Sequence, residues 1–419
     1  MAISSTNKNH WYLFLLFPFF AAVFAMKNYK IYWAKNIIWA FVVFFGFSFG
    51  LAKETSSGEE TADVFRSFSQ LEELHKMDVG FIQIVKLYTT NEDIDILKLT
   101  ISIVISRFTD SQQVLLAVYG LIFGFFFSRN MWFVLDRLKG RLKRVTLLLF
   151  VAYFLVDPIW NINGFRFHTA THMFIYGLLP FLYGGKKKSL WMCLLSVLVH
   201  FSFILPVLVL GAYLIIGNRT VAYFVFFLVS IAASEINVAG FNSIVEANAP
   251  AYLIERTSTY RDEGKVEEYR EGTKGGELIQ SVWYAKIYLK TLYWPLMVFL
   301  IFLFFKRKKI ERISSSFLSS LCFTLFYWGV ANFMSSLPSG VRYVAIAALA
   351  ALPLIIFYIQ NQAKEEYLSK KVLMASPAIL LFIIVSIRVG FYSLSVNTIL
   401  GNPLVALFTN NIALNDLIK

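Results

Sequence analysis

The feature that most constrains this chain is a series of apolar runs, each about as long as a helix and separated from the next by a polar or basic segment. The runs lie at about 11–26, 37–52, 111–128, 145–159, 167–183, 189–201, 203–216, 220–236, 287–305, 315–333, 341–360 and 372–391. They do not alternate as the strands of an outer-membrane barrel do. Since helices satisfy their own backbone hydrogen bonds in lipid, we expect one all-α polytopic membrane domain over 1–419, with about twelve transmembrane helices.

Composition supports a lipid bilayer as the main surroundings of the chain. Charged residues make up 16% of the sequence and hydrophobic residues 58%, whereas soluble domains have about 25% charged residues. The net charge of +13 does not indicate nucleic acid as a partner, because the basic residues lie in short segments between the apolar runs. Cys193 and Cys322 lie inside apolar runs, so neither a disulfide framework nor a zinc site is expected.

The basic segments predict the topology. They lie at 27–35, 129–144, 186–188, 219, 306–312 and 364–371. Cytoplasmic loops are enriched in Lys and Arg, and all six segments fall on one side only if 189–216 crosses the membrane twice, with a break near His200. We therefore expect two crossings there, and both termini outside.

Two long segments then face outward. Residues 53–96 carry ten acidic side chains against four basic ones, and residues 237–283 carry eight against five. Both segments are therefore predicted to be extracytoplasmic loops. Within the first, Val64, Phe68 and Leu71 have the spacing of an amphipathic helix suited to the membrane surface.

Several cations lie at the predicted outer ends of the helices, where the positive-inside rule predicts few. They are Arg166, Lys286, Lys290, Arg342 and Arg388. Lys286 and Arg388 are consistent with snorkelling to the headgroups. Arg166 and Arg342 follow the Gly-containing turns NING and SSLPSG, and arginine binds phosphate in a bidentate manner. We therefore expect a diphosphate site around Arg166 and Arg342. Lys290, Lys286 and Arg388 are further candidates for this site.

Histidines and carboxylates at the same predicted face supply candidate proton-transfer groups. His168 and His172 are four residues apart and share a helix face, but no third metal ligand is placed by the sequence, so no metal site is expected. His200 is either a catalytic group or a polar residue of the helix core. The general base stays open among Asp63, Asp157, His168, His172 and Glu235. Motifs for nucleotide binding are absent from the sequence.

The chain resembles the EpsG family of Wzy-like polysaccharide polymerases. Four local matches carry the resemblance: Asp63 in ADVFRSF, Arg166 and Ala170 in NGFRFHTATH, His200 in HFSFILP, and Arg342 in SLPSGVRYV. The matches extend over residues 63–343, and each is short.

The resemblance implies an enzyme of the bacterial inner membrane that makes O-antigen, capsule or exopolysaccharide. It implies a fold similar to C-type membrane glycosyltransferases, an active site facing the periplasm or exterior, and catalysis without metal or another cofactor. The implied substrates are oligosaccharide repeat units on polyprenyl diphosphate, and a chain-length regulator of the export system is an implied partner. Two alternatives remain: a flippase for the same lipid-linked oligosaccharide, and a membrane acyltransferase acting on surface glycans.

Overall fold

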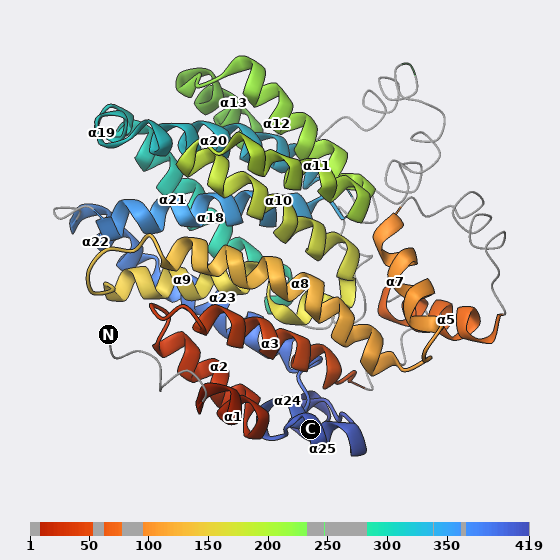
Figure 1. Cartoon of the computed structure of the whole chain (residues 1–419). Helices are drawn as coiled ribbons and strands as arrows, with labels where there is room; N and C mark the ends of the chain where they lie inside the picture. The colour runs from red at the N-terminus through yellow and green to blue at the C-terminus, as the bar shows by residue number, and fades with distance from the viewer. Residues whose placement is uncertain are drawn as a thin grey trace.

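The computed structural model describes residues 9–52, 63–77, 95–232, 247, 283–337, 339–361 and 366–418 (Figure 1). Within these ranges the chain is helical, and β structure is limited to an isolated bridge between Ser395 and Ala413. Most of the predicted loops 53–96 and 237–283 lies outside the described residues, as does Glu235.

The first half of the chain forms helices up to the predicted third basic segment. These are α1 (Asn9–Leu16), α2 (Pro18–Lys27), α3 (Ala34–Phe47), α5 (Asp63–Lys76), α7 (Ile96–Ser106), α8 (Gln112–Leu135), α9 (Arg144–Val156), the 3₁₀ helix η1 (Ile159–Gly164), α10 (Phe165–Gly184) and η2 (Lys187–Ser189). The amphipathic helix expected in the first loop is confirmed as α5, which buries Val64, Leu71 and Leu74.

The second half continues with shorter helices before three long ones. These are α11 (Leu190–Val199), η3 (Phe201–Phe203), α12 (Ile204–Ile216), α13 (Thr220–Ala232), α18 (Trp283–Phe305), α19 (Arg307–Ile313), α20 (Ser315–Met334), α21 (Val341–Asn361), α22 (Glu366–Met374), α23 (Ser376–Gly390), α24 (Val396–Leu400), α25 (Pro403–Phe408) and η4 (Leu414–Leu417).

Helix length supports a multi-pass membrane protein. Among the described residues, five helical stretches are long and apolar enough to cross a membrane, or six if the bent pair α22–α23 is one span, and five further apolar helices have 10–17 residues. One of the five, Arg144–Gly184, contains both α9 and α10. The total of about twelve stays a prediction, because the shorter helices fall below the ~20 residues of a full span.

The apolar stretch 189–216 is broken at His200, which has an extended backbone with φ −151° and ψ 119°. The aromatic ring of Phe203 then packs against that of Phe167 at the start of α10. At the far end of α12, the Tyr213 hydroxyl donates to the Ser319 carbonyl near the start of α20. Because α11 begins close to the end of α10, α11 and α12 run in opposite directions between the two ends of the molecule.

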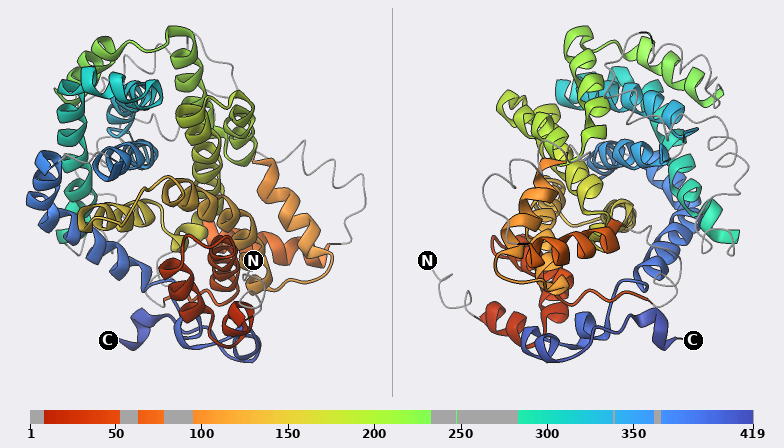
Figure 2. Two further views of the ribbon diagram at one scale, coloured as in Figure 1. Left: turned by 60° about the vertical axis from the view of Figure 1, so that its left-hand side comes forward. Right: turned by 90° about the vertical axis from the view of Figure 1, so that its right-hand side faces the viewer.

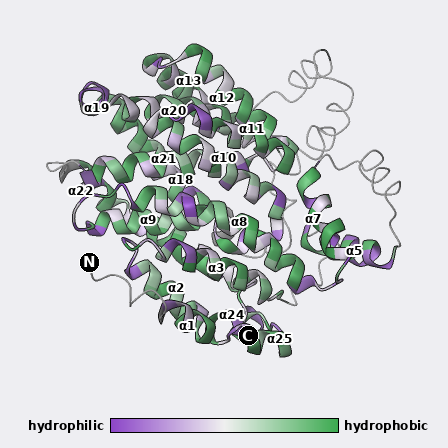
Figure 3. Ribbon diagram, in the orientation of Figure 1, coloured by the Kyte–Doolittle hydropathy of each residue, from purple (hydrophilic) through white to green (hydrophobic). Residues whose placement is uncertain are grey.

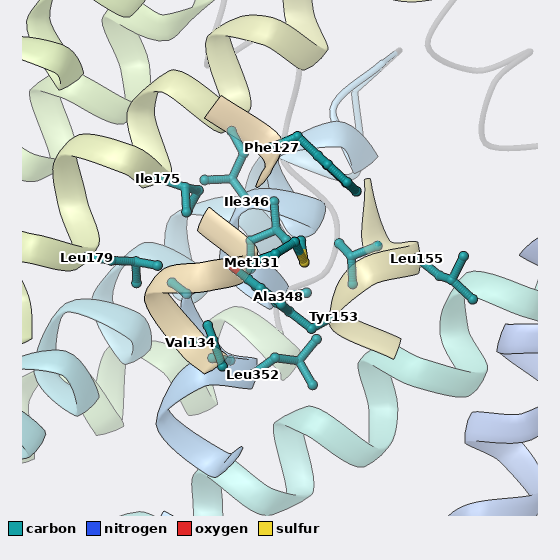
Figure 4. Close-up of a cluster of buried hydrophobic side chains, with 14 of the residues drawn as sticks. Phe127, Met131, Val134, Tyr153, Leu155, Ile175, Leu179, Ile346, Ala348 and Leu352 are labelled. Carbon is teal, nitrogen blue, oxygen red and sulfur yellow. The ribbon is translucent and has the colours of Figure 1, made fainter. Parts of the chain in front are cut away.

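The core lies between α8, α9, α10 and α21. Figure 4 shows side chains of these four helices meeting, among them Met131, Tyr153, Ile175 and Ile346. The four side chains are buried. Since α21 has most of its side chains buried, it forms the centre of the helix assembly.

The described parts of all six predicted basic segments gather at one end of the molecule, which we call the basic end. Trp132 Nε1 donates to the Tyr29 carbonyl at 2.9 Å, and Gln360 Nε2 donates to the Lys139 carbonyl at 2.7 Å. Ring contacts and hydrogen bonds also join the segments at 186–188, 219 and 306–312 to their neighbours: Tyr183 with Phe357, Ser320 with Tyr183, Asn218 with Ser319, and Lys309 with Tyr358. In Figure 3 the hydrophilic colour appears along α19 and α22 at this end.

At the opposite end, the C-terminal segment lies beside the first helices (Figure 2). The Gly50 amide donates to the Ser393 carbonyl at 3.0 Å, and the Ala52 amide donates to the Tyr392 carbonyl at 3.1 Å. Helices α5 and α7 also lie at this end (Figure 1).

Candidate functional site

Arg166 lies between two carboxylates at the end opposite the basic end. It is the second residue of α10, and its Nη1 donates to Asp95 Oδ2 at 2.8 Å. Its Nη2 lies 3.4 Å from Oδ1 of Asp63, the first residue of α5. The side chain of Asp95 is 2% exposed, that of Arg166 18% and that of Asp63 32%. The buried pair is therefore Arg166 with Asp95, and Asp63 is its partly solvated neighbour.

Asp95 connects this ion pair to the break at His200. Its Oδ1 accepts the backbone N–H of Phe201 at 3.0 Å. Asp95 was not predicted as a site residue, because its place in the sequence shows only one of ten acidic side chains in the first predicted loop. A signal was present, since Asp95 directly precedes the apolar run ILKLTISIVIS that forms α7, a helix that was also not predicted.

Phe167 is the aromatic residue around which the rest of the site packs. The Arg342 guanidinium carbon lies 5.5 Å from the centre of the Phe167 ring, and the His200 ring centre lies 5.5 Å from it. Next to Arg342, the Tyr343 hydroxyl donates to the Ser202 carbonyl at 3.2 Å. Residues from α5, α10, the His200 break and α21 therefore converge, and they include Asp63, Arg166, His200 and Arg342, one from each of the four sequence motifs.

The two glycine turns support this arrangement sterically. A Cβ at Gly340 would lie 1.7 Å from the Met334 carbonyl oxygen, so only glycine lets the turn before Arg342 fold against the end of α20. At Gly164 a Cβ would lie 2.9 Å from His168 Cδ2. The Gly164 position therefore leaves room for the imidazole of His168.

A second, more buried group forms around Asp157. Since Asp157 precedes Pro158, a helical backbone is disfavoured there, and α9 ends with Asp157 at φ −136° and ψ 79°. Asp157 Oδ1 lies 2.6 Å from His168 Nδ1 and accepts from Asn161 Nδ2 at 2.8 Å. His172 Nε2 lies 3.2 Å from the Asp157 carbonyl oxygen. His168 and His172 thus share a helix face, as predicted, and that face is turned toward Asp157.

The hydrogen bonds indicate which ring nitrogen carries the proton in each of the three histidines. A carboxylate only accepts hydrogen bonds, so His168 carries its proton on Nδ1 and has a lone pair on Nε2. His172 donates from Nε2 to a carbonyl, and its Nδ1 accepts from Asn130. His200 Nδ1 accepts from the Ser202 N–H at 3.2 Å, so in its neutral form the proton of His200 is on Nε2.

Arg166 and His168 point to different partners, although they are two residues apart. Arg166 faces Asp63 and Asp95, whereas His168 faces Asp157. The reason is that α10 is already helical from Phe165, so residues two apart project to different sides. Within the described ranges, no group of three His, Cys, Asp or Glu side chains is placed to hold a metal ion.

We call Arg166 and Arg342, with the residues that they contact, the arginine cluster. Among the described residues, no contact joins the remaining predicted cations to this cluster. Arg388 Nη1 donates to Asn415 Oδ1 at 2.7 Å and lies over the ring of Tyr392, both in the C-terminal segment. Lys290 is exposed on α18. Lys286 is in α18, and its side chain lies outside the described residues.

The electrostatic balance around Asp63 favours its ionised form. Burial alone would raise the pKa of Asp63, but the charges of Arg166, Arg66, Lys98 and Arg342 outweigh it and keep the pKa of this carboxyl below its ordinary value. The site therefore combines fixed negative charge with an excess of cations, an arrangement that attracts an anion.

The fold and the site together define a multi-pass membrane protein with a charged cluster at the end of the helices opposite the basic end. The chain belongs to the EpsG family, whose family model matches residues 62–400. This match confirms the family resemblance seen in the sequence and supports a role in polysaccharide biosynthesis. Comparison with curated proteins and comparison with solved structures give no match.

Proposed function

We propose that this protein is a polymerase that joins polyprenyl-diphosphate-linked oligosaccharide repeat units at the outer face of the bacterial inner membrane. The observation that carries the proposal is the convergence of Asp63, Arg166, His200 and Arg342 from four separate segments at one end of the molecule. Family membership supports the proposed substrate class, and the clustering of the basic segments at the other end supports the proposed orientation.

The proposed reaction transfers the growing glycan from its carrier to a sugar hydroxyl of the next repeat unit. The bond between the anomeric carbon and the diphosphate oxygen breaks, and its electron pair leaves with polyprenyl diphosphate. The acceptor hydroxyl oxygen forms the new bond to the anomeric carbon and passes its proton to a base. Negative charge grows on the leaving oxygen, so the site must present fixed positive charge there.

Arg342 is the best-placed residue to bind the diphosphate. It is exposed, and among the described residues no carboxylate lies within ion-pair distance of it. The charge of Arg166 is partly neutralised by its ion pairs with Asp63 and Asp95. It therefore attracts a diphosphate less strongly than Arg342 does, but its side chain is held in one position. Lys290 is exposed and remains a candidate second cation. We therefore assign diphosphate binding to Arg342, with Arg166 behind it.

Among the candidate bases, His168 fits the chemistry best. Its side chain is 20% exposed, its Nε2 has a lone pair, and Asp157 on Nδ1 stabilises the imidazolium that forms when a proton is taken up. Asp157 and His172 are buried, and the charges around Asp63 make it a weak base. His200, with its proton on Nε2, serves as a hydrogen-bond donor.

The test is elongation by the purified protein in lipid, supplied with polyprenyl-diphosphate repeat units and a chelator, without nucleotide. We expect a ladder of longer glycans, consistent with a fold of the C-type glycosyltransferase kind that needs no metal or other cofactor. Arg342→Ala should abolish the ladder. Arg388→Ala is the matched control, because Arg388 lies toward the same end and bonds Asn415. Both variants are checked for monodisperse elution.

Other outcomes identify the alternatives. Movement of the substrate between leaflets without elongation would make the protein a flippase, with the arginines as a gate. Transfer of label from an acyl donor to the glycan would make it an acyltransferase. A full ladder from Arg342→Ala would refute the assignment of Arg342 to the diphosphate site but would leave the proposed polymerase activity standing.

Addition of the chain-length regulator of the same export system should change the length distribution of the ladder and leave its formation unchanged.

A further inference from the structure

A cleft of about 540 Å³ lies at the basic end, far along the helices from the arginine cluster. It is formed by the segment between α2 and α3 and the segment between α8 and α9. Its lining includes the cations Lys27, Lys30 and Arg141, together with Tyr29, Ile31 and Leu142. The proposed polymerase reaction uses none of these residues.

The three cations around the cleft are free to bind an anion. Each is exposed, and among the described residues none lies within ion-pair distance of a carboxylate. Three like charges around one concave surface repel one another and create a positive potential inside it. The lining therefore favours a ligand with at least one negative charge.

The walls of the cleft are held together without a ligand. Trp132 Nε1 donates to the carbonyl of Tyr29, a lining residue, at 2.9 Å, and Arg129 Nη2 donates to Asn36 Oδ1 at 2.9 Å. On the other side, Gln360 Nε2 donates to the carbonyl of Arg141 at 3.0 Å. Because these bonds fix both segments, a ligand would meet a preformed site and pay little ordering cost.

The position of the cleft indicates that its ligand has an apolar part. The four apolar helices α2, α3, α8 and α9 begin or end beside it, so it lies at the depth where these helices leave the hydrocarbon. Ile31 in its lining is 42% exposed, and Phe24, one turn before Lys27, is 44% exposed. An anionic head next to exposed apolar side chains is the chemistry of a phospholipid.

We propose that this cleft binds the phosphate headgroup of an anionic phospholipid, with the acyl chains lying along the exposed side of α2. Basic clefts between helices at the cytoplasmic surface suit such headgroups. Each basic residue near an anionic surface contributes about a fivefold gain in affinity. Removal of all three cations should therefore weaken binding about 100-fold.

The experiment is native mass spectrometry of the full-length protein titrated with phosphatidylglycerol, with phosphatidylcholine as the neutral comparison. The test variant is Lys27→Gln/Lys30→Gln/Arg141→Gln. The matched control is Lys186→Gln/Lys187→Gln/Lys188→Gln, which removes three cations at the same end but outside the cleft. We expect the Kd for phosphatidylglycerol to rise about 100-fold in the test variant and less than about fivefold in the control.

Three results would overturn the proposal. Equal weakening in both variants would show a general surface-charge effect, and no weakening in the test variant would show that the cleft is not the site. Displacement of the lipid by millimolar inorganic phosphate would show a site for a free anion. If the triple variant does not fold, the exposed Arg141→Glu alone should still weaken lipid binding at least tenfold, and failure to do so would also overturn it.

Discussion

Replacement of Asp95 by asparagine tests the central ion pair of the site. Asp95 is buried and uses both carboxylate oxygens, one for Arg166 Nη1 at 2.8 Å and one for the Phe201 amide at 3.0 Å. Asparagine keeps one accepting oxygen and places an NH₂ group against the other donor. The variant therefore removes the negative charge beside Arg166. It also places the new NH₂ group against one of the two N–H donors, Arg166 Nη1 or the Phe201 amide, so that no hydrogen bond forms there.

The expected cost follows from the burial of the pair. Breaking a fully buried ion pair costs about 3–5 kcal/mol. Arg166 keeps 18% of its side chain exposed and retains Asp63 at 3.4 Å, so solvent and the second carboxylate recover part of that cost. We expect the free energy of unfolding to fall by about 2–3 kcal/mol, which lies within the range of about 1.5–3 kcal/mol for a hydrogen bond to a charged group.

The assay is reversible unfolding in mixed detergent micelles, followed by tryptophan fluorescence. The matched control is Asp63→Asn, since Asp63 touches the same arginine but is 32% exposed, and it should cost less than about 1 kcal/mol. A double-mutant cycle with Arg166→Gln isolates the pair. Equal costs for the two asparagine variants, or a coupling energy between Asp95 and Arg166 below about 0.5 kcal/mol, would refute the reasoning.

Three further predictions follow from the site. Gly164→Ala should push the His168 ring aside and lower the elongation rate about 10–100-fold, whereas Gly184→Ala on the same helix, whose Cβ would meet only Lys186 Cγ at 3.8 Å, should leave the rate unchanged. The lowered pKa of Asp63 means that its charged form stabilises the fold above about pH 4 and that this contribution disappears as the pH falls through the lowered pKa. The stability difference between wild type and Asp63→Asn, measured by unfolding, should therefore shrink as the pH falls below about 4, and a constant difference would contradict this. Arg388→Gln should cost about 1–3 kcal/mol of unfolding free energy through its lost bond to the C-terminal segment while elongation continues, and loss of elongation would return Arg388 to the diphosphate site.

The sequence predicted those features of the site that depend on local pattern. His168 and His172 share a face because they are four residues apart on a helix. The turns before Arg166 and Arg342 both contain a glycine, and the structure requires the one at Gly340 because a Cβ there would meet the Met334 carbonyl oxygen. The break near His200 was predicted from the length of its apolar run and from the charges on either side. Each of these rests on residues close together in the chain.

Other parts of the site were not predictable from local pattern. Asp95 was counted among the acids of a loop, and only the packing of α7 against α10 and α11 makes it the partner of Arg166. Arg388 was placed with the diphosphate cations because it is near the end of a helix, but the fold of the C-terminal segment gives it Asn415. The sequence also left the general base open, since the contact between Asp157 and His168 depends on how α9 meets α10.

By itself, the sequence determined that the chain is helical, that it lies in a membrane, that its basic segments share one end, and that it resembles the EpsG family. Composition and the period of the apolar residues carry that information, because burial in lipid constrains every helix in the same way. Only the tertiary structure decided which charges meet. Arg166 pairs with carboxylates 71 and 103 residues away, and contacts over such separations are set by the packing of whole helices and not by the residues next to them in the chain.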